Sequence, residues 1–118
     1  MTQLAYILGL GGAFGAVLRF AIGQLLSDDR FPVSTLVVNA VGSFLLGLAV
    51  FGGLNGDLFI FFAVGLCGSF TTYSSFSVDA IELWDSNPKK AVVYVVMMTL
   101  LCLAAAGLAA GVVRLVSP

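Results

Sequence analysis

Charged side chains are scarce in this 118-residue chain, since only 9% of its residues are Asp, Glu, Lys or Arg. A water-exposed domain carries roughly 25% charged residues, so this chain has too few to cover a soluble surface. Five basic against six acidic residues give a net charge of −1, and this balance excludes the basic surface that binds nucleic acid. With 60% hydrophobic residues and a mean hydropathy of +1.11, the composition indicates a membrane protein.

Histidine is absent and only two cysteines occur, so the sequence offers no zinc-binding set and no imidazole base. Cys67 and Cys102 lie in separate apolar runs. Packing is their expected role, and a disulfide between them is the alternative. The carboxylates are expected in loops or at helix ends, where no acid–base pair sits in a buried site. An enzyme is therefore not expected.

Four apolar runs separate the charges, at about residues 4–26, 33–54, 58–78 and 91–113. Each run is long enough for a transmembrane helix, which needs about 20 residues. Pro32 and Pro88 stand just before the second and fourth runs, where a missing backbone donor costs nothing at a helix start. The amino end lacks the basic region of a secretory signal, so we expect the first run to be retained. Residues 1–118 are predicted to form a single four-helix transmembrane domain, a multi-pass protein of the cell membrane.

Short charged segments connect the runs. The first connection carries Asp28, Asp29 and Arg30, and the third carries Trp84 beside mixed charge in AIELWDSNPKK, residues 80–90. An aromatic ring beside charge is typical of a segment at headgroup level. We therefore expect the third connection to be an interfacial loop.

Most of the 14 glycines lie inside the runs. Gly11 and Gly15 in the first run, and Gly107 and Gly111 in the fourth, have the four-residue spacing that lets helices approach closely in lipid. These pairs predict a compact bundle or a dimer, but they do not indicate a function.

Three polar features interrupt the apolar runs, and the first two lie in the first and second runs. Arg19 either snorkels to the membrane interface or faces a water-filled vestibule that attracts anions. Asn39 and Ser43 are one helical turn apart on the same face. They either hydrogen-bond between helices or present donors to a small anion in a pore.

The third polar feature is the segment GSFTTYSSFS, residues 68–77. An intact helix would bond its hydroxyls back to its own carbonyls. A broken helix, which we favour, would free carbonyls at mid-membrane for protein or a bound ion to satisfy. Thr72 and Ser75 add donors, and the rings of Tyr73 and Phe76 lie on neighbouring faces with edges of partial positive charge. A pathway with donors, one cation and no carboxylate favours a small anion.

Three segments then identify a resemblance: GGAFGAVLRF, STLVVNAVGSFLLG and GLCGSFTTYSSFS, beginning at residues 11, 34 and 65. In order and spacing they resemble the signatures of the Fluc/CrcB family of fluoride channels, over essentially the whole chain. The resemblance implies an all-α channel in which two four-helix subunits insert antiparallel in lipid, each with a broken third helix. It also implies passive fluoride export that lowers cytoplasmic fluoride, and a central structural Na⁺.

The same resemblance implies roles for individual residues. Asn39 would line the pore and Arg19 the vestibule, while Tyr73 and Phe76 would occupy two aromatic positions beside fluoride. Backbone carbonyls of Gly68 and Thr71 would bind the Na⁺ where the two broken helices cross.

The sequence departs from the family pattern at two positions. Tyr73 stands where the family usually has Phe, so its hydroxyl needs a partner. Tyr94 is expected on the pore side, but Met98 follows it where the family often has Ser. One polar wall of the pore is then missing.

Two other classes have similar architecture. A small multidrug transporter needs an acidic residue in its first helix, where this chain has Arg19 instead. A non-conducting accessory subunit remains an alternative.

The distribution of basic residues near the spans indicates whether the chain pairs with a second copy of itself or with a related subunit. These residues number three on one face (Arg30, Lys89 and Lys90), or four if Arg19 snorkels to that side, against Arg114 on the other. Because lysine and arginine near the spans set orientation, a chain that inserts both ways should have almost no bias. The bias here is modest, so a homodimer is expected, and a heterodimer with a related subunit of opposite orientation is the alternative.

Overall fold

The computed structural model describes residues 2–27 and 30–117, so Asp28 and Asp29 of the first connection lie outside the described residues. Four spans in this part of the chain are long and apolar enough to cross a membrane. Three are single helices: α1 (Thr2–Leu25), α2 (Val33–Phe51) and α6 (Pro88–Val116). The third span, Gly56–Ser86, consists of α3 (Gly56–Phe59), the π-helical η1 (Ile60–Cys67), α4 (Gly68–Phe70) and α5 (Ser74–Ser86).

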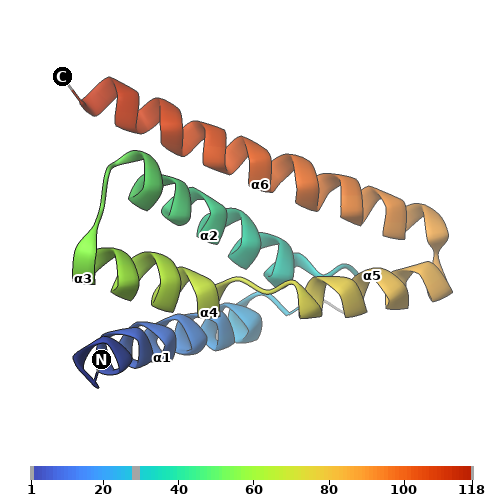
Figure 1. The fold of residues 1–118 in the computed structure, drawn as a ribbon. Coiled ribbons are helices and arrows are strands. Elements are labelled where there is room, and N and C mark those ends of the chain that lie inside the picture. The colour runs from blue at the N-terminus through green and yellow to red at the C-terminus, as the bar shows by residue number, and fades with distance from the viewer. Residues whose placement is uncertain (1, 28–29, 118) are drawn as a thin grey trace.

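The described residues contain helices and no strand, which confirms the predicted all-α fold with a broken third span. The spans run back and forth along the molecule (Figure 1). Both termini lie at one end, and the connections after α1 and α5 lie at the other. α6 packs along α2, while α1 packs along η1 and α4.

The ends of α1, α2 and α6 lie within three residues of the ends of the predicted runs, but the third span is longer than expected. The predicted run ended at residue 78, whereas α5 continues to Ser86. The expected loop at residues 80–90 is therefore wrong, because hydropathy marks where the apolar surface ends rather than where helical hydrogen bonding ends. Asn87 is extended at φ −157° and ψ 96°, since a residue before proline avoids the helical region. Pro88 then opens α6, as predicted.

Glycine sets the close contact between α1 and the first half of the third span. A Cβ added at Gly11 would collide with the carbonyl of Phe61, and one at Gly15 with the carbonyl of Leu66. The Ser69 hydroxyl donates to the Gly12 carbonyl at 2.7 Å across the same contact. The predicted close approach at Gly11 and Gly15 is thus confirmed.

Gly107 and Gly111 behave differently, because a Cβ added at either would meet nothing within 4 Å in the described chain. They lie on a face of α6 that no described helix of this chain covers.

The buried core lies between α2, α5 and α6. It centres on Leu36, Tyr94 and Met98, of which Tyr94 is fully buried at 0% exposure. Phe76 and Cys102 pack against this cluster. Both cysteines are free thiols, and Cys67 is buried, so packing rather than a disulfide is their role here.

Candidate functional site

The third span breaks in its middle, between Phe70 at the end of α4 and Ser74 at the start of α5. Thr71 leaves the helix with extended backbone angles, φ −81° and ψ 161°. The unwound segment is visible between α4 and α5 in Figure 1. The predicted break in this hydroxyl-rich segment is confirmed.

The side chain of Asn39 in α2 holds the break by two hydrogen bonds to one residue. Its Nδ2 donates to the Thr72 carbonyl at 2.8 Å, and its Oδ1 accepts from the Thr72 N–H at 2.8 Å. In a continuous helix the Thr72 N–H would donate to the Gly68 carbonyl. Asn39 therefore replaces the helical hydrogen bond of Thr72 at this point. Its side chain does hydrogen-bond to another span, which is one of the two roles that the sequence allows for it.

The Thr72 hydroxyl caps the second half of the span. The Ser75 N–H donates to Thr72 Oγ1 at 3.1 Å, whereas a continuous helix would direct it to the Thr71 carbonyl. The carbonyls of Gly68 and Thr71 thus both lose their ordinary helical donors. Carbonyl oxygens released in this way are the ligand type that a hard cation prefers, so these two residues fit the Na⁺ that the resemblance implies.

A cavity of about 430 Å³ lies against the break, between α1, α2 and α5. Five of its lining residues are polar: Arg19, Ser34, Thr35, Thr72 and Ser75. None of the described residues that line it is acidic. The structure therefore brings Arg19, Thr72 and Ser75 together around one hollow, in keeping with a vestibule that attracts anions. Ser34 and Thr35 also line this cavity, although no pattern in the sequence singles them out.

Asn39 has a further contact, with α6. Its Nδ2 lies 3.5 Å from the sulfur of Met98, a residue that is 5% exposed. The Cys102 thiol donates to the same sulfur at 3.8 Å. A thioether is only a weak acceptor. The second amide proton of Asn39 is thus held more loosely than the one that Thr72 accepts.

Asp79 corrects the expectation that carboxylates occur only in loops or at helix ends. It lies inside α5, where its Oδ2 accepts from Thr35 Oγ1 at 2.8 Å and from the Tyr94 hydroxyl at 3.3 Å. These two donors compensate for the free-energy cost of partly burying the carboxylate. The missed signal was its spacing: if α5 continues past residue 78, Asp79 is one turn beyond Ser75 and Phe76 and shares their face.

The aromatic residues form a row from the surface to the core. The ring centroids of Tyr73 and Phe76 are 6.1 Å apart, and those of Phe76 and Tyr94 are 5.4 Å apart. Tyr73 is 81% exposed, while Tyr94 is fully buried with its hydroxyl on Asp79. The ring of Tyr73 therefore projects from the surface of the described chain.

Ser43 lies apart from the Arg19 cavity. It lines a separate hollow of about 340 Å³ between α2 and α6, together with Cys102. Asn39 and Ser43 thus share a helix, but the structure does not bring Ser43 to the hollow that contains Arg19.

The sequence of this chain matches that of a known protein family. The model of a family described as CrcB-like protein, Camphor Resistance (CrcB), matches residues 6–112. The chain belongs to the CrcB family. With four spans able to cross a membrane, this CrcB protein is a multi-pass protein of the cell membrane.

Three relatives of this CrcB chain are informative. A protein of Haloarcula marismortui named fluoride-specific ion channel FluC 2 is 44% identical over 115 residues, which cover 97% of each chain. A Thermotoga maritima protein named fluoride-specific ion channel FluC is 38% identical over 104 residues, covering 80% of this chain and 82% of the relative. A protein of Thermus thermophilus with the same name is 45% identical over 84 residues, covering 65% of this chain and 67% of the relative.

Proposed function

We propose that this CrcB protein forms a channel that conducts fluoride selectively and passively out of the cell, lowering cytoplasmic fluoride. The observation that carries the proposal is the acid-free Arg19 cavity at the helix break. The names of the relatives support the choice of fluoride.

The Arg19 cavity offers an anion a positive charge and free hydrogen-bond donors. Thr35 commits its proton to Asp79, so the available hydroxyl donors there belong to other residues. Ser75 lines the cavity, and its hydroxyl has no protein partner among the described residues. Fluoride that sheds water in this cavity would find replacement donors at Ser75 and Arg19.

Asn39 is the donor at the inner side of this path. Its second amide proton faces the weakly accepting sulfur of Met98, and fluoride is a far stronger acceptor than a thioether. We propose that fluoride takes the place of the sulfur at this proton, while the Thr72 bonds keep the amide oriented. In this proposal Phe76 and Tyr73 face the anion with their ring edges.

We further propose that two copies associate in antiparallel orientation around a Na⁺. The diverted donors of Gly68 and Thr71 support this assignment, because oxygen atoms freed at mid-membrane need a partner. Bound Na⁺ would supply a fixed positive charge that satisfies these carbonyls and would not be transported. The exposed ring of Tyr73 and the uncovered Gly107–Gly111 face are surfaces that a second copy would bury. A homodimer is proposed, and the charge bias at the helix connections keeps a heterodimer as the alternative.

Removing one free donor tests the pathway. In liposomes that contain only this chain, Ser75→Ala should lower fluoride flux about tenfold, because it deletes a hydrogen bond worth about 1.5 kcal/mol. Ser86→Ala is the matched control, since its hydroxyl bonds to the Leu83 carbonyl at the end of α5. Equal flux in wild type, Ser75→Ala and Ser86→Ala would contradict the proposed pathway.

The Na⁺ proposal has a separate test. After extraction of tightly bound ions, exchange of Na⁺ for a large organic cation should lower both the melting temperature and fluoride flux. Return of Na⁺ should restore both. If neither quantity responds, Gly68 and Thr71 do not bind Na⁺ and the dimer must satisfy their carbonyls in another way.

A further inference from the structure

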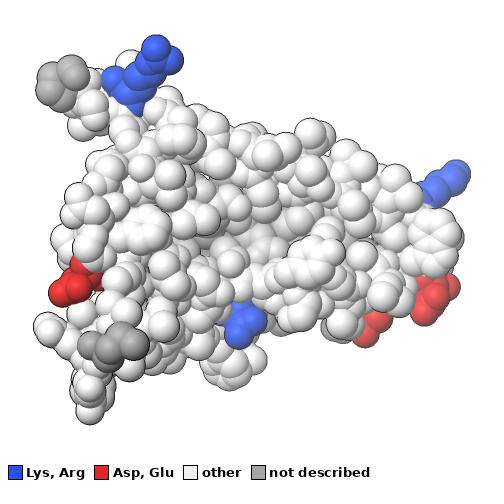
Figure 2. Space-filling model, in the orientation of Figure 1, with Lys and Arg blue, Asp and Glu red and all other residues white. Residues whose placement is uncertain are grey.

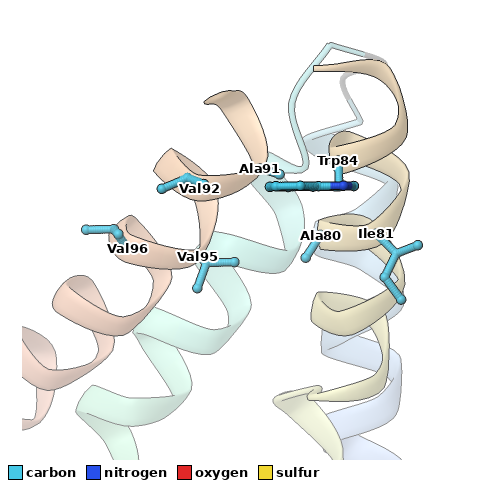
Figure 3. A pocket seen from close by; sticks show the side chains of 7 residues that line it. All are labelled: Ala80, Ile81, Trp84, Ala91, Val92, Val95 and Val96. Atoms are coloured by element: carbon cyan, nitrogen blue, oxygen red, sulfur yellow. The ribbon is translucent and has the colours of Figure 1, made fainter. Parts of the chain in front are cut away.

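An apolar groove lies between α5 and α6, close to the connection at Asn87. The hollow measures about 350 Å³. Its lining is apolar and consists of Ala80, Ile81 and Trp84 from α5 and of Ala91, Val92, Val95 and Val96 from α6. Figure 3 shows the Trp84 ring reaching from α5 toward Ala91 in α6, on the side nearest the connection. Ala80 and Val95 lie about one helical turn farther from that end. We call this hollow the Trp84 groove.

A cationic side chain adjoins the Trp84 groove. A second hollow of about 480 Å³ shares Trp84 and Val92 with it and is also lined by Pro88 and Lys89. Lys90 follows and is exposed. Basic side chains stand over the start of α6 at this end of the molecule, and acidic side chains lie below them over α5 (Figure 2).

The acidic residues of α5 do not occupy the groove. Glu82 lines a different cavity, which it shares with Arg30 and Asp79. Asp85 is exposed and lines neither hollow. Among the described residues, Lys89 is therefore the charged side chain that lines these two hollows, and Lys90 follows it in the chain.

The position of the groove relative to the membrane indicates which ligand it binds. Tryptophan and lysine beside a helix connection mark the level of the lipid headgroups. The apolar part of the groove then lies just inside the hydrocarbon, and the lysines lie at the phosphate level. We propose that the Trp84 groove binds one acyl chain of an anionic phospholipid, whose phosphate is held by Lys89 and Lys90. This site does not depend on the proposed transport of fluoride.

The chain carries its own reporter for this site, because Trp84 is the only tryptophan. The purified chain is reconstituted in vesicles that contain increasing fractions of phosphatidylglycerol or phosphatidylcholine, each brominated on the same acyl carbons. Bromine quenches tryptophan fluorescence on contact. Each lysine near a membrane surface contributes about 1 kcal/mol toward an anionic lipid, so Lys89 and Lys90 together correspond to about thirtyfold in affinity. Half-maximal quenching should therefore need about thirtyfold less phosphatidylglycerol than phosphatidylcholine.

Charge variants sharpen the experiment. Lys89→Gln with Lys90→Gln should bring the two lipids to equal quenching, and so should salt high enough to screen the lysines. Arg114→Gln is the matched control, since it removes a cation at the opposite end of the molecule, and it should keep the preference. Equal quenching by both lipids in the wild type would overturn the proposal, because the groove would hold only bulk lipid. Absence of quenching by either lipid would also overturn it, because protein, such as a second copy, would then cover Trp84.

Discussion

The two halves of the broken third span are held by different kinds of contact. The first half, η1 and α4, lies against α1 through glycine, so that backbone meets backbone at Gly11 and Gly15. The second half, α5, is held by side-chain hydrogen bonds that reach from α2 and α6 to Thr72 and Asp79. The break lies where one mode of packing gives way to the other. Close glycine packing makes a scaffold, whereas directional polar contacts leave donors and a cavity beside them.

The largest effect on fluoride flux is expected at Asn39, which lies where glycine packing gives way to side-chain hydrogen bonds. Asn39→Asp should abolish fluoride flux, because a carboxylate has no proton to donate to the Thr72 carbonyl or to fluoride. Asn55→Asp makes the same chemical change just before α3, away from the break, and should keep wild-type flux. The readout is fluoride efflux from liposomes, with circular dichroism to establish helix content. Wild-type flux in folded Asn39→Asp protein would contradict the role of Asn39.

The next effect is a loss of fold stability, which is expected in the half of the third span that packs on glycine. Gly15→Ala should destabilise the fold by about 1–3 kcal/mol, because its Cβ would overlap a backbone carbonyl that cannot move aside. Thermal unfolding in detergent measures the effect. Gly9→Ala is the control, because nothing lies within 4 Å of a Cβ added there. Equal melting temperatures for the two variants would show that α1 does not pack closely on this span.

A similar or slightly smaller effect is expected in the second half. Asp79→Leu removes the acceptor of Thr35 and Tyr94 and leaves a buried hydroxyl without a partner, at a cost of about 1–2 kcal/mol. Thermal unfolding should show a lower midpoint than in Asp85→Leu, which changes an exposed carboxylate of the same helix. If Asp85→Leu lowers the midpoint as much, the contacts of Asp79 do not anchor α5.

The smallest effect concerns Met98. Met98→Ser should raise fluoride flux a few-fold, since a hydroxyl can both accept from Asn39 and donate to fluoride, where a thioether only accepts weakly. Met97→Ser is the control, because Met97 is 38% exposed on another face of α6. The flux ratio of the two variants is the measurement. A ratio of one would mean that Met98 does not limit the path.

The two halves also differ in how far the sequence predicts them. The contact at Gly11 and Gly15 follows from residue spacing, because close approach needs only small residues on one helix face. The break follows from the density of hydroxyls after Gly68. The two bonds between Asn39 and Thr72 could not be predicted, because they join residues 33 positions apart and depend on how α2 packs against the break in the third span. The place of Asp79 inside α5 could not be predicted, because a charge ordinarily marks the end of an apolar span and the two hydroxyl donors that allow Asp79 to lie inside come from other helices.

The most direct measurement is ion release from liposomes that contain this chain and no other protein. Vesicles loaded with equal potassium fluoride and potassium chloride are diluted into a solution free of both anions, with a potassium ionophore present so that K⁺ leaves with the anion and charge stays balanced. Each anion is followed with its own electrode. We predict rapid release of fluoride, with chloride retained as in protein-free vesicles. Fluoride release no faster than in protein-free vesicles, or equal release of the two ions, would contradict a fluoride-selective channel.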